Sequence, residues 1–268
     1  MSQHIAKRFD RELDQLREHI LSMGGFVERA IRHSMQSMLD QDDILASKTI
    51  ERDKIINAME IQCDNMTRKI LARRQPTAGD LRFIVASIKV VTDLERIGDL
   101  AAGIAQGVLD AGEHPLRDSL VLEIMGEDVQ SQVNRALDAF SREDVDLAVS
   151  VLTQHEGISR LYRSMYREIL TYMMEDQRLI TSSIILSNIA RNLETISGHA
   201  RNIAEMVIYM IRGHDIRHVD HEAAARILEE TNQQDMPGSM PDHHHPEQGV
   251  AKSIVTLVSK PDRKPKAG

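Results

Sequence analysis

Two heptapeptides that lie 99 positions apart decide the fold. Residues 93–99 read Asp-Leu-Glu-Arg-Ile-Gly-Asp, and residues 192–198 read Asn-Leu-Glu-Thr-Ile-Ser-Gly. The match continues downstream, so that residues 94–105 and 193–204 share six identical positions. The shared apolar residues recur at steps of three and four, which is the period of one face of an amphipathic helix. A duplicated helical unit that stacks its apolar faces predicts a pseudo-symmetric molecule.

Turn-forming residues divide the rest of the chain into six expected helices, which end near residues 40, 74, 111, 140, 176 and 212. Only two of the seven prolines, Pro76 and Pro115, precede residue 235. We expect Pro76 to open the third helix, because a first-turn proline loses no hydrogen bond. Ser141 followed by Asp144 resembles a capping arrangement for the fifth helix. The second helix is expected to begin at a cap formed by Asp42 or Asp43.

The composition favours an all-α fold. Hydrophobic residues make up 41% of the 268 residues, but aromatic residues only 3%, and β-sheets enrich β-branched and aromatic residues together. We expect two tandem three-helix bundles, at residues 1–114 and 115–217. The proline-rich, polar residues 218–268 predict a flexible, disordered C-terminal extension.

Charge and cysteine content exclude several classes of protein. The formal net charge of −8 argues against a nucleic-acid partner. The single cysteine, Cys63, cannot form a disulfide within one chain, and it is expected to be a small core residue. No apolar run has the length of a membrane span, and the N-terminus is too polar for a signal peptide. We expect a cytoplasmic protein that meets membranes only through its partners.

Paired carboxylates are the strongest candidate site. Glu60 and Asp64 are four residues apart, as are Glu95 and Asp99, so each pair shares one helix face. Two antiparallel helices could join the pairs into a cluster of oxygen ligands suited to Mg²⁺, Mn²⁺, Ca²⁺ or iron. The alternative is that all four are solvated surface acids, as most such pairs are.

A helical projection favours the cluster over the solvated alternative. At about 100° per residue, Glu95 falls between Ile84 and Ile88, and Asp99 falls beside Leu81. Acids on or beside an apolar sector need partners, because lone buried charges are strongly disfavoured. The basic residues fall in a different sector, which should face water; Arg82 and Arg96 among them are candidates for partner contacts.

The sequence contains no motif of an enzyme active site. No Glu is followed three residues later by His, and there is no nucleophile elbow, Walker loop or His-Glu-x-x-His. There is also no basic anion-binding loop. We therefore expect a protein that is not an enzyme. A carboxylate-cluster metalloprotein, with a hydrolase, oxidase or metal-storage role, is the alternative.

Several motifs together resemble the PhoU family. They are residues 93–99, the segment Arg-Gln-Pro-Thr-Ala-Gly-Asp-Leu-Arg at 74–82, Tyr-Met-Met-Glu-Asp at 172–176, Asn-Ile-Ala-Glu at 202–205 and residues 213–218. The resemblance covers about residues 1–218. It implies two three-helix bundles related by pseudo-symmetry, and a negative regulator of the phosphate-starvation response. Such proteins link the phosphate ABC transporter to a sensor histidine kinase, modulate phosphate uptake, and often form homodimers.

The resemblance also implies metal binding. Some family members bind Mg²⁺, Mn²⁺, iron or zinc through Glu/Asp-x-x-x-Asp motifs, which correspond here to Glu60, Asp64, Glu95 and Asp99. The second half departs from the family pattern, because Gly198 stands where an acid is usual and Thr195 where an Arg is usual. A second metal cluster is therefore not expected, although Glu194 and His199 remain candidates for a weak cation site. The phosphate signal is expected to arrive through the transporter.

Overall fold

A computed structural model describes residues 2–73, 75–114 and 116–213, and the predicted C-terminal extension lies outside these residues. The elements are α1 (Ser2–Asp40), α2 (Asp43–Arg73), α3 (Ala78–Ala111), α4 (Leu120–Arg142), α5 (Val145–Glu175), the short 3₁₀-helix η1 (Gln177–Leu179) and α6 (Ile180–Arg212). The described part of the chain contains no β-strand, which confirms the predicted all-α class. None of its helices combines the length and apolarity that a membrane crossing requires.

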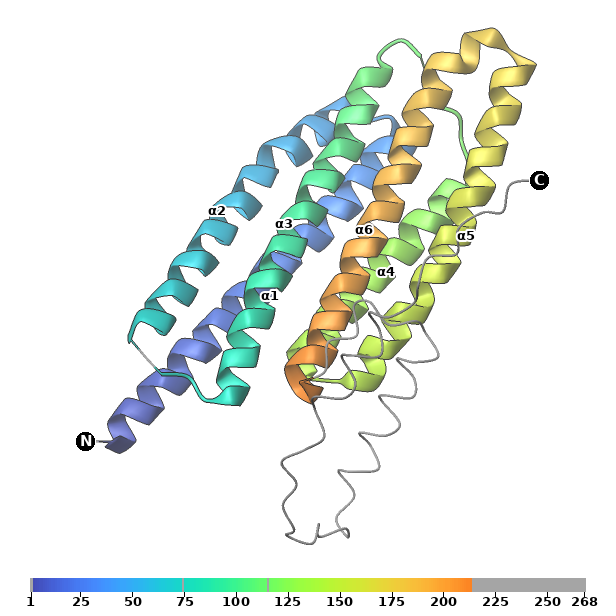
Figure 1. Cartoon of the computed structure of the whole chain (residues 1–268). Coiled ribbons are helices and arrows are strands. Elements are labelled where there is room, and N and C mark those ends of the chain that lie inside the picture. Colours follow the sequence, from blue (N-terminus) through green and yellow to red (C-terminus); the bar gives the residue numbers. More distant parts are fainter. Residues whose placement is uncertain (1, 74, 115, 214–268) are drawn as a thin grey trace, which may run out of the picture. The chain divides into compact units, whose positions relative to one another are not determined.

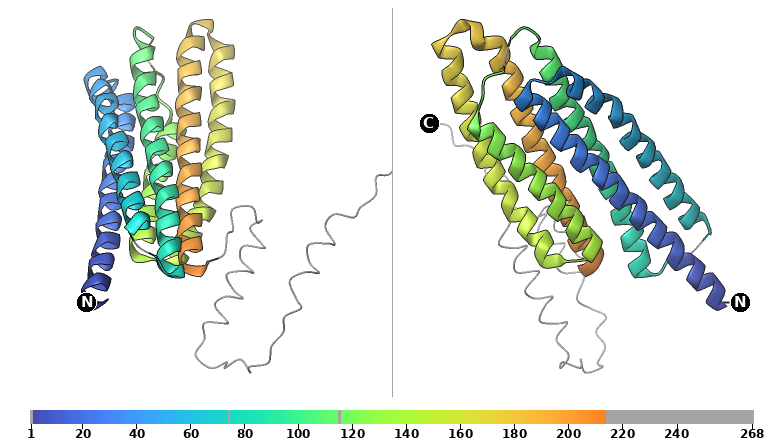
Figure 2. Two further views of the ribbon diagram at one scale, coloured as in Figure 1. Left: turned by 60° about the vertical axis from the view of Figure 1, so that its left-hand side comes forward. Right: turned by 180° about the vertical axis from the view of Figure 1, so that it is seen from behind.

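The six helices form two groups of three that share one core. Helices α3 and α6 pack side by side, with α2 against α3 and α5 against α6 (Figure 1). Helices α1 and α4 lie behind this row and also touch each other (Figure 2). The predicted pair of pseudo-symmetric three-helix bundles is therefore confirmed.

Burial explains why the two heptapeptides resemble each other. The repeated apolar side chains have no exposed surface in either helix: Leu94, Ile97 and Ile104 of α3, and Leu193, Ile196 and Ile203 of α6. Each such side chain contributes about 1.5–3 kcal/mol of transfer free energy when it is fully buried. The repeat is thus the core of the molecule, and it places the polar residues between these positions at the edges of the helix contacts.

Several helix ends follow the sequence signals, and two differ from expectation. Pro76 does not open α3; Thr77 precedes the helix, and the Asp80 carboxylate accepts the Thr77 N–H at 3.3 Å. Ser141 does not cap α5, because it lies in the last turn of α4. Asp144 itself is the cap, and its carboxylate accepts the Leu147 N–H at 2.9 Å. In both cases an acid near the helix start satisfies an N–H that the helix leaves unpaired.

The remaining ends agree with the sequence. The carboxylate of Asp42 accepts the N–H groups of Ile44 and Leu45, both at 2.9 Å, and so caps α2. Helices α3 and α6 end at Gly112 and Gly213, whose φ angles of 50° and 75° favour glycine.

Candidate functional site

The predicted acids lie on facing sides of α2 and α3. Glu60 of α2 interacts electrostatically with Glu95 and Asp99 of α3, and also with Asp64 on its own helix. Glu95 is mostly buried, with 17% of its side chain exposed, whereas Asp64 and Asp99 are exposed. We call this set, together with Asp53, the acidic groove.

The charges of the acidic groove oppose one another. Burial raises the pKa of Glu60, and the neighbouring carboxylates of Asp64 and Asp99 raise it further. Burial likewise raises the pKa of Glu95, with added repulsion from Asp99 and Glu60. Arg96 lowers both pKa values and only partly offsets these effects. A bound cation would remove the repulsion, because opposite charge favours the ionised form.

Asp53 is a member of the acidic groove that the motif search missed. Burial raises its pKa, as does the charge of Asp99. Asn57 donates to its Oδ2 atom at 3.1 Å, while the buried Oδ1 atom has no hydrogen-bond partner among the described residues. The signal was present in the sequence, because positions 53, 57, 60 and 64 follow helical steps of four, three and four along one face.

The helical projection was partly wrong about the surroundings of these acids. Ile84 is fully buried as expected, but the other two residues that defined the apolar sector, Leu81 and Ile88, are 44% and 38% exposed. Asp99 therefore lies at the surface rather than within the core. Leu81 and Ile88 lie on a side of α3 that its neighbours α1, α2 and α6 do not fully cover, which a single-helix projection does not reveal.

The acidic groove fits a cation in its chemistry but does not present a closed set of ligands. All five acids offer carboxylate oxygens, which hard cations prefer, and Asp53 contributes a buried oxygen without a partner. Among the residues that the structure describes, however, no three His, Cys, Asp or Glu side chains converge on one point. A cation held there would require the side chains of Glu60, Glu95 and Asp99 to turn toward one another.

The corresponding groove of the second half, between α5 and α6, has different chemistry. Its members at matching positions are His155, Ser159, Tyr162 and Tyr166 on α5 and Glu194 and Gly198 on α6. The Ser159 hydroxyl donates to Glu194 Oε1 at 3.4 Å, and His155 Nδ1 lies 2.8 Å from Ser197 Oγ. Burial lowers the pKa of His155, against an opposing effect of Glu194.

Glu194 and His199, the predicted weak cation pair, make separate contacts. The Nδ1 atom of His199 lies 2.8 Å from Asp93 Oδ1, on the other half of the molecule. Asn202 donates to the same Asp93 oxygen at 3.1 Å. His199 thus links α6 to α3, while Glu194 belongs to the α5–α6 groove.

The resemblance in sequence extends to both halves. The PhoU domain model matches residues 20–108 and, separately, residues 122–207. The chain belongs to the PhoU family. A phosphate-specific transport system accessory protein PhoU homolog of Pseudomonas aeruginosa is 44% identical over 222 residues, which cover 82% of this chain and 91% of the relative. The phosphate-specific transport system accessory protein PhoU of Escherichia coli is 36% identical over 229 residues, which cover 85% of this chain and 95% of the relative.

Solved PhoU structures have the same fold. The crystal structure of PhoU from Pseudomonas aeruginosa has a TM-score of 0.74 at 44% identity, covering 77% of this chain and all of that one. The phosphate transport system regulatory protein PhoU from Streptococcus pneumoniae has a TM-score of 0.73 at 29% identity, and the match covers 77% of this chain and 98% of that one. These relatives bear the names of accessory and regulatory proteins rather than of enzymes.

The two arginines singled out in this PhoU-family chain have different surroundings. Arg82 donates from Nε to the Met210 carbonyl at 3.1 Å, so it joins α3 to the end of α6. Arg96 is 60% exposed and lies 3.5 Å from Glu95 and 3.8 Å from Asp99. Arg96 remains the better candidate for a partner contact, because its guanidinium group has a large solvent-facing surface.

Cys63 is a core residue. It is buried in α2, and burial raises the pKa of its thiol to about 12, with added repulsion from Asp64 and Glu60. A thiol with this pKa stays protonated at neutral pH and is a poor nucleophile and metal ligand.

Proposed function

We propose that this PhoU-family chain is a negative regulator of the phosphate-starvation response. It acts as a signalling adaptor that links the ATPase subunit of the phosphate ABC transporter to a sensor histidine kinase. The observation that carries the proposal is the PhoU match on both halves, together with relatives named as accessory proteins of phosphate-specific transport. In this proposal, the helical faces hold the kinase inactive while transport is saturated, and they modulate uptake through the ATPase subunit.

An apolar stripe on α5 supports a role in docking. Tyr166, Leu170 and Met174 recur every four residues, and their exposed fractions are 51%, 43% and 88%. Side chains at this spacing lie on one face of a helix, and contiguous exposed apolar residues mark protein–protein contacts more often than single ones do. The stripe fits a protein partner, or the second copy of a homodimer in the cytoplasm.

Deletion of the gene in its host tests the adaptor role. Alkaline phosphatase activity should rise in high-phosphate medium, and the wild-type gene should restore repression. A Leu170→Glu, Met174→Glu variant should restore repression less well, because two carboxylates at a docking face oppose burial. Ile61→Glu, at an exposed apolar position on α2, is the matched control. A deletion strain that keeps alkaline phosphatase repressed would refute the proposal.

We also propose that the acidic groove binds a divalent or ferric cation, with Mg²⁺, Mn²⁺, iron and zinc as the candidates. Mutual repulsion among Asp53, Glu60, Glu95 and Asp99, and the unpartnered oxygen of Asp53, favour this second function. The cation would neutralise these charges and join α2 to α3.

Metal analysis of the purified protein tests this site. The wild type should retain metal that a Glu95→Ala, Asp99→Ala variant loses, whereas equal content in the two proteins would contradict the proposal. Phosphatase and oxidase assays on the same samples separate regulation from the hydrolase, oxidase and metal-storage alternatives. Activity that follows metal content would point to an enzyme.

A further inference from the structure

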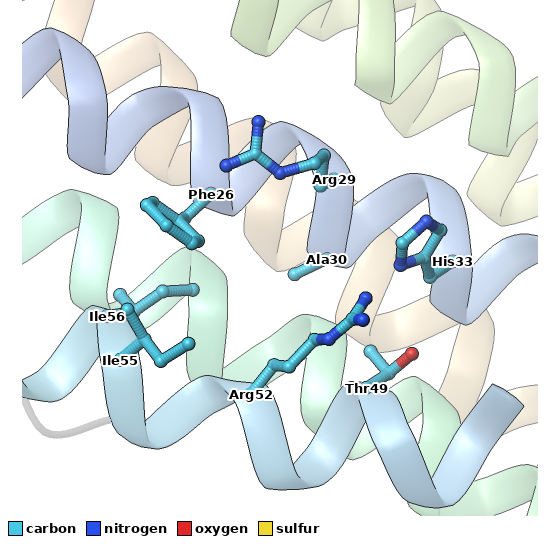
Figure 3. A pocket seen from close by; sticks show the side chains of 8 residues that line it. All are labelled: Phe26, Arg29, Ala30, His33, Thr49, Arg52, Ile55 and Ile56. Carbon is cyan, nitrogen blue, oxygen red and sulfur yellow. The ribbon is translucent and has the colours of Figure 1, made fainter.

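A second feature that involves α2 is a pocket of about 370 Å³ between α1 and α2 (Figure 3). Its apolar surface comes from Phe26, Ala30, Ile55 and Ile56. Its basic residues are Arg29 and His33 on α1 and Arg52 on α2. We call it the basic pocket.

The basic pocket contains two permanent positive charges, those of Arg29 and Arg52. Among the described residues, neither Arg29 nor Arg52 has a carboxylate within ion-pair distance. Burial lowers the pKa of His33, and the charges that lower it further belong to Arg52, Arg32 and Arg29. This local excess of positive charge is unusual in a chain with a formal net charge of −8. An anion would stabilise it.

Arg52 and His33 approach each other across the pocket, and Arg29 lies at its other end, over Phe26. Figure 3 shows Arg52 extending from α2 toward the imidazole of His33 on α1. The guanidinium group of Arg29 lies over the ring of Phe26, 4.4 Å from its centroid, so the ring helps to hold it in place. Two guanidinium groups supply forked donors, which match the oxygens of a phosphate group.

The size of the basic pocket selects among anions. Pockets for small organic ligands have volumes of about 300–1,000 Å³ and are lined mainly by apolar side chains. Inorganic phosphate alone would fill little of this space and would leave the surface formed by Phe26, Ile55 and Ile56 uncovered. An anion with an apolar body would cover that surface and remove it from water.

We propose that the basic pocket binds a phosphate monoester with a small apolar or aromatic body. Arg52 and His33 donate hydrogen bonds to the phosphate, the permanent charge of Arg29 adds to the attraction, and the organic group packs on Phe26 and Ile55. No motif in the sequence predicts this site, because no loop carries an anion-binding motif and its residues come from two helices. The site does not depend on the adaptor role or on the acidic groove.

Isothermal titration of the full chain with phenyl phosphate, inorganic phosphate and phenol tests the proposal. Phenyl phosphate should bind with one-to-one stoichiometry, and both inorganic phosphate and phenol should bind at least about tenfold more weakly. Arg52→Gln should weaken phenyl phosphate binding by about tenfold or more, because a charge-assisted hydrogen bond is lost. Ile55→Glu should do the same, since it places a carboxylate at the mouth. Arg68→Gln, also exposed on α2 but outside the pocket, should bind like the wild type.

Circular dichroism establishes that each variant is folded, which is expected because all three substituted residues are exposed. The proposal fails if phenyl phosphate gives no saturable binding at millimolar concentrations, or if Arg52→Gln and Arg68→Gln bind it equally. Phenol binding as tight as that of phenyl phosphate would also overturn it, because the cations would then contribute nothing. Equal affinities for inorganic and phenyl phosphate would overturn the assignment of an organic body.

Discussion

At the scale of single residues, Glu60 and Glu95 each lie where the surroundings disfavour their own charge. Burial is the largest cause of the raised pKa of both carboxyl groups, and the charges of the other acids in the groove raise each pKa further. The arginine next to them, Arg96, is largely exposed, so solvent weakens its compensating effect. The acidic groove therefore reduces the stability of the cation-free protein.

Replacing Glu60 by Gln should stabilise the cation-free protein at neutral pH. The pKa of Glu60 is raised above its ordinary value of 4.5, so its ionisation costs stability as the pH rises through that value, and the loss persists at higher pH. We expect the free energy of unfolding to rise by about 0.5 kcal/mol at pH 7. At about pH 3.5 we expect no change, because Glu60 is then protonated in both the folded and the unfolded protein.

Urea unfolding in the presence of a chelator, at both pH values, measures this difference. Glu51→Gln, on the exposed surface of the same helix, is the control and should change stability little at either pH. A Glu60→Gln protein that is less stable than the wild type at neutral pH would contradict the repulsion described for the groove.

At the scale of helices, glycines set how closely the two halves approach. A Cβ atom on Gly24 of α1 would lie 2.7 Å and 2.8 Å from the two methyl groups of Leu137 on α4. Contacts this short force atoms to move, and Leu137 is buried, so its side chain has little room to shift. Gly24 is therefore required by the packing of α1 against α4, although glycine within a helix is otherwise unfavourable.

Gly24→Ala should destabilise the protein by about 1 kcal/mol, because overpacking of about 1–3 kcal/mol exceeds the gain in helix propensity of up to about 1 kcal/mol. Gly157→Ala on α5 is the control, since only a flexible arginine tip lies near its added Cβ atom. The control should be more stable by about 0.5–1 kcal/mol. Thermal unfolding measures both, and a stabilised Gly24→Ala protein would show that α1 and α4 can separate at no cost.

At the scale of the described molecule, α3 and α6 join the two halves through matching positions. Asp93 accepts hydrogen bonds from Asn202 and contacts His199. At the same offset of 99, Asn192 corresponds to Asp93 and Gly103 to Asn202, and the Asn192 amide nitrogen would lie 3.0 Å from a Cβ atom on Gly103. One side of the pseudo-symmetric contact is thus a hydrogen-bonded cluster, and the other is a close approach made possible by glycine.

Asp93→Ala should lower the free energy of unfolding by about 2 kcal/mol, since two hydrogen bonds are lost at a mostly buried site. Because both halves share one core, unfolding should remain a single transition with an unchanged denaturant slope. Urea unfolding followed by circular dichroism tests this. Thr92→Ala, the exposed neighbour, should change stability little. A second transition in Asp93→Ala would indicate that the halves unfold independently.

The part of the site that could be predicted consists of residue pairs whose two members lie on the same helix. The pairs Glu60–Asp64 and Glu95–Asp99 follow from i, i+4 spacing, and the loss of an acid at Gly198 was visible in the repeat. The contact of His199 with Asp93 could not be predicted, because it depends on how α6 is rotated against α3. Sequence spacing reports which residues share a helix face, but it does not report which other helix that face meets.

The sequence by itself determined the helical class, the duplication, the family and the position of most helix ends. These are local properties, set by the period of apolar residues and by the residues that cap or terminate a helix. Only the tertiary structure decided which acids gather in one groove, that Leu81 and Ile88 stay exposed, and that two arginines and a histidine from α1 and α2 line one pocket. Those outcomes depend on the distance and rotation between packed helices, which side-chain packing decides across residues far apart in the chain.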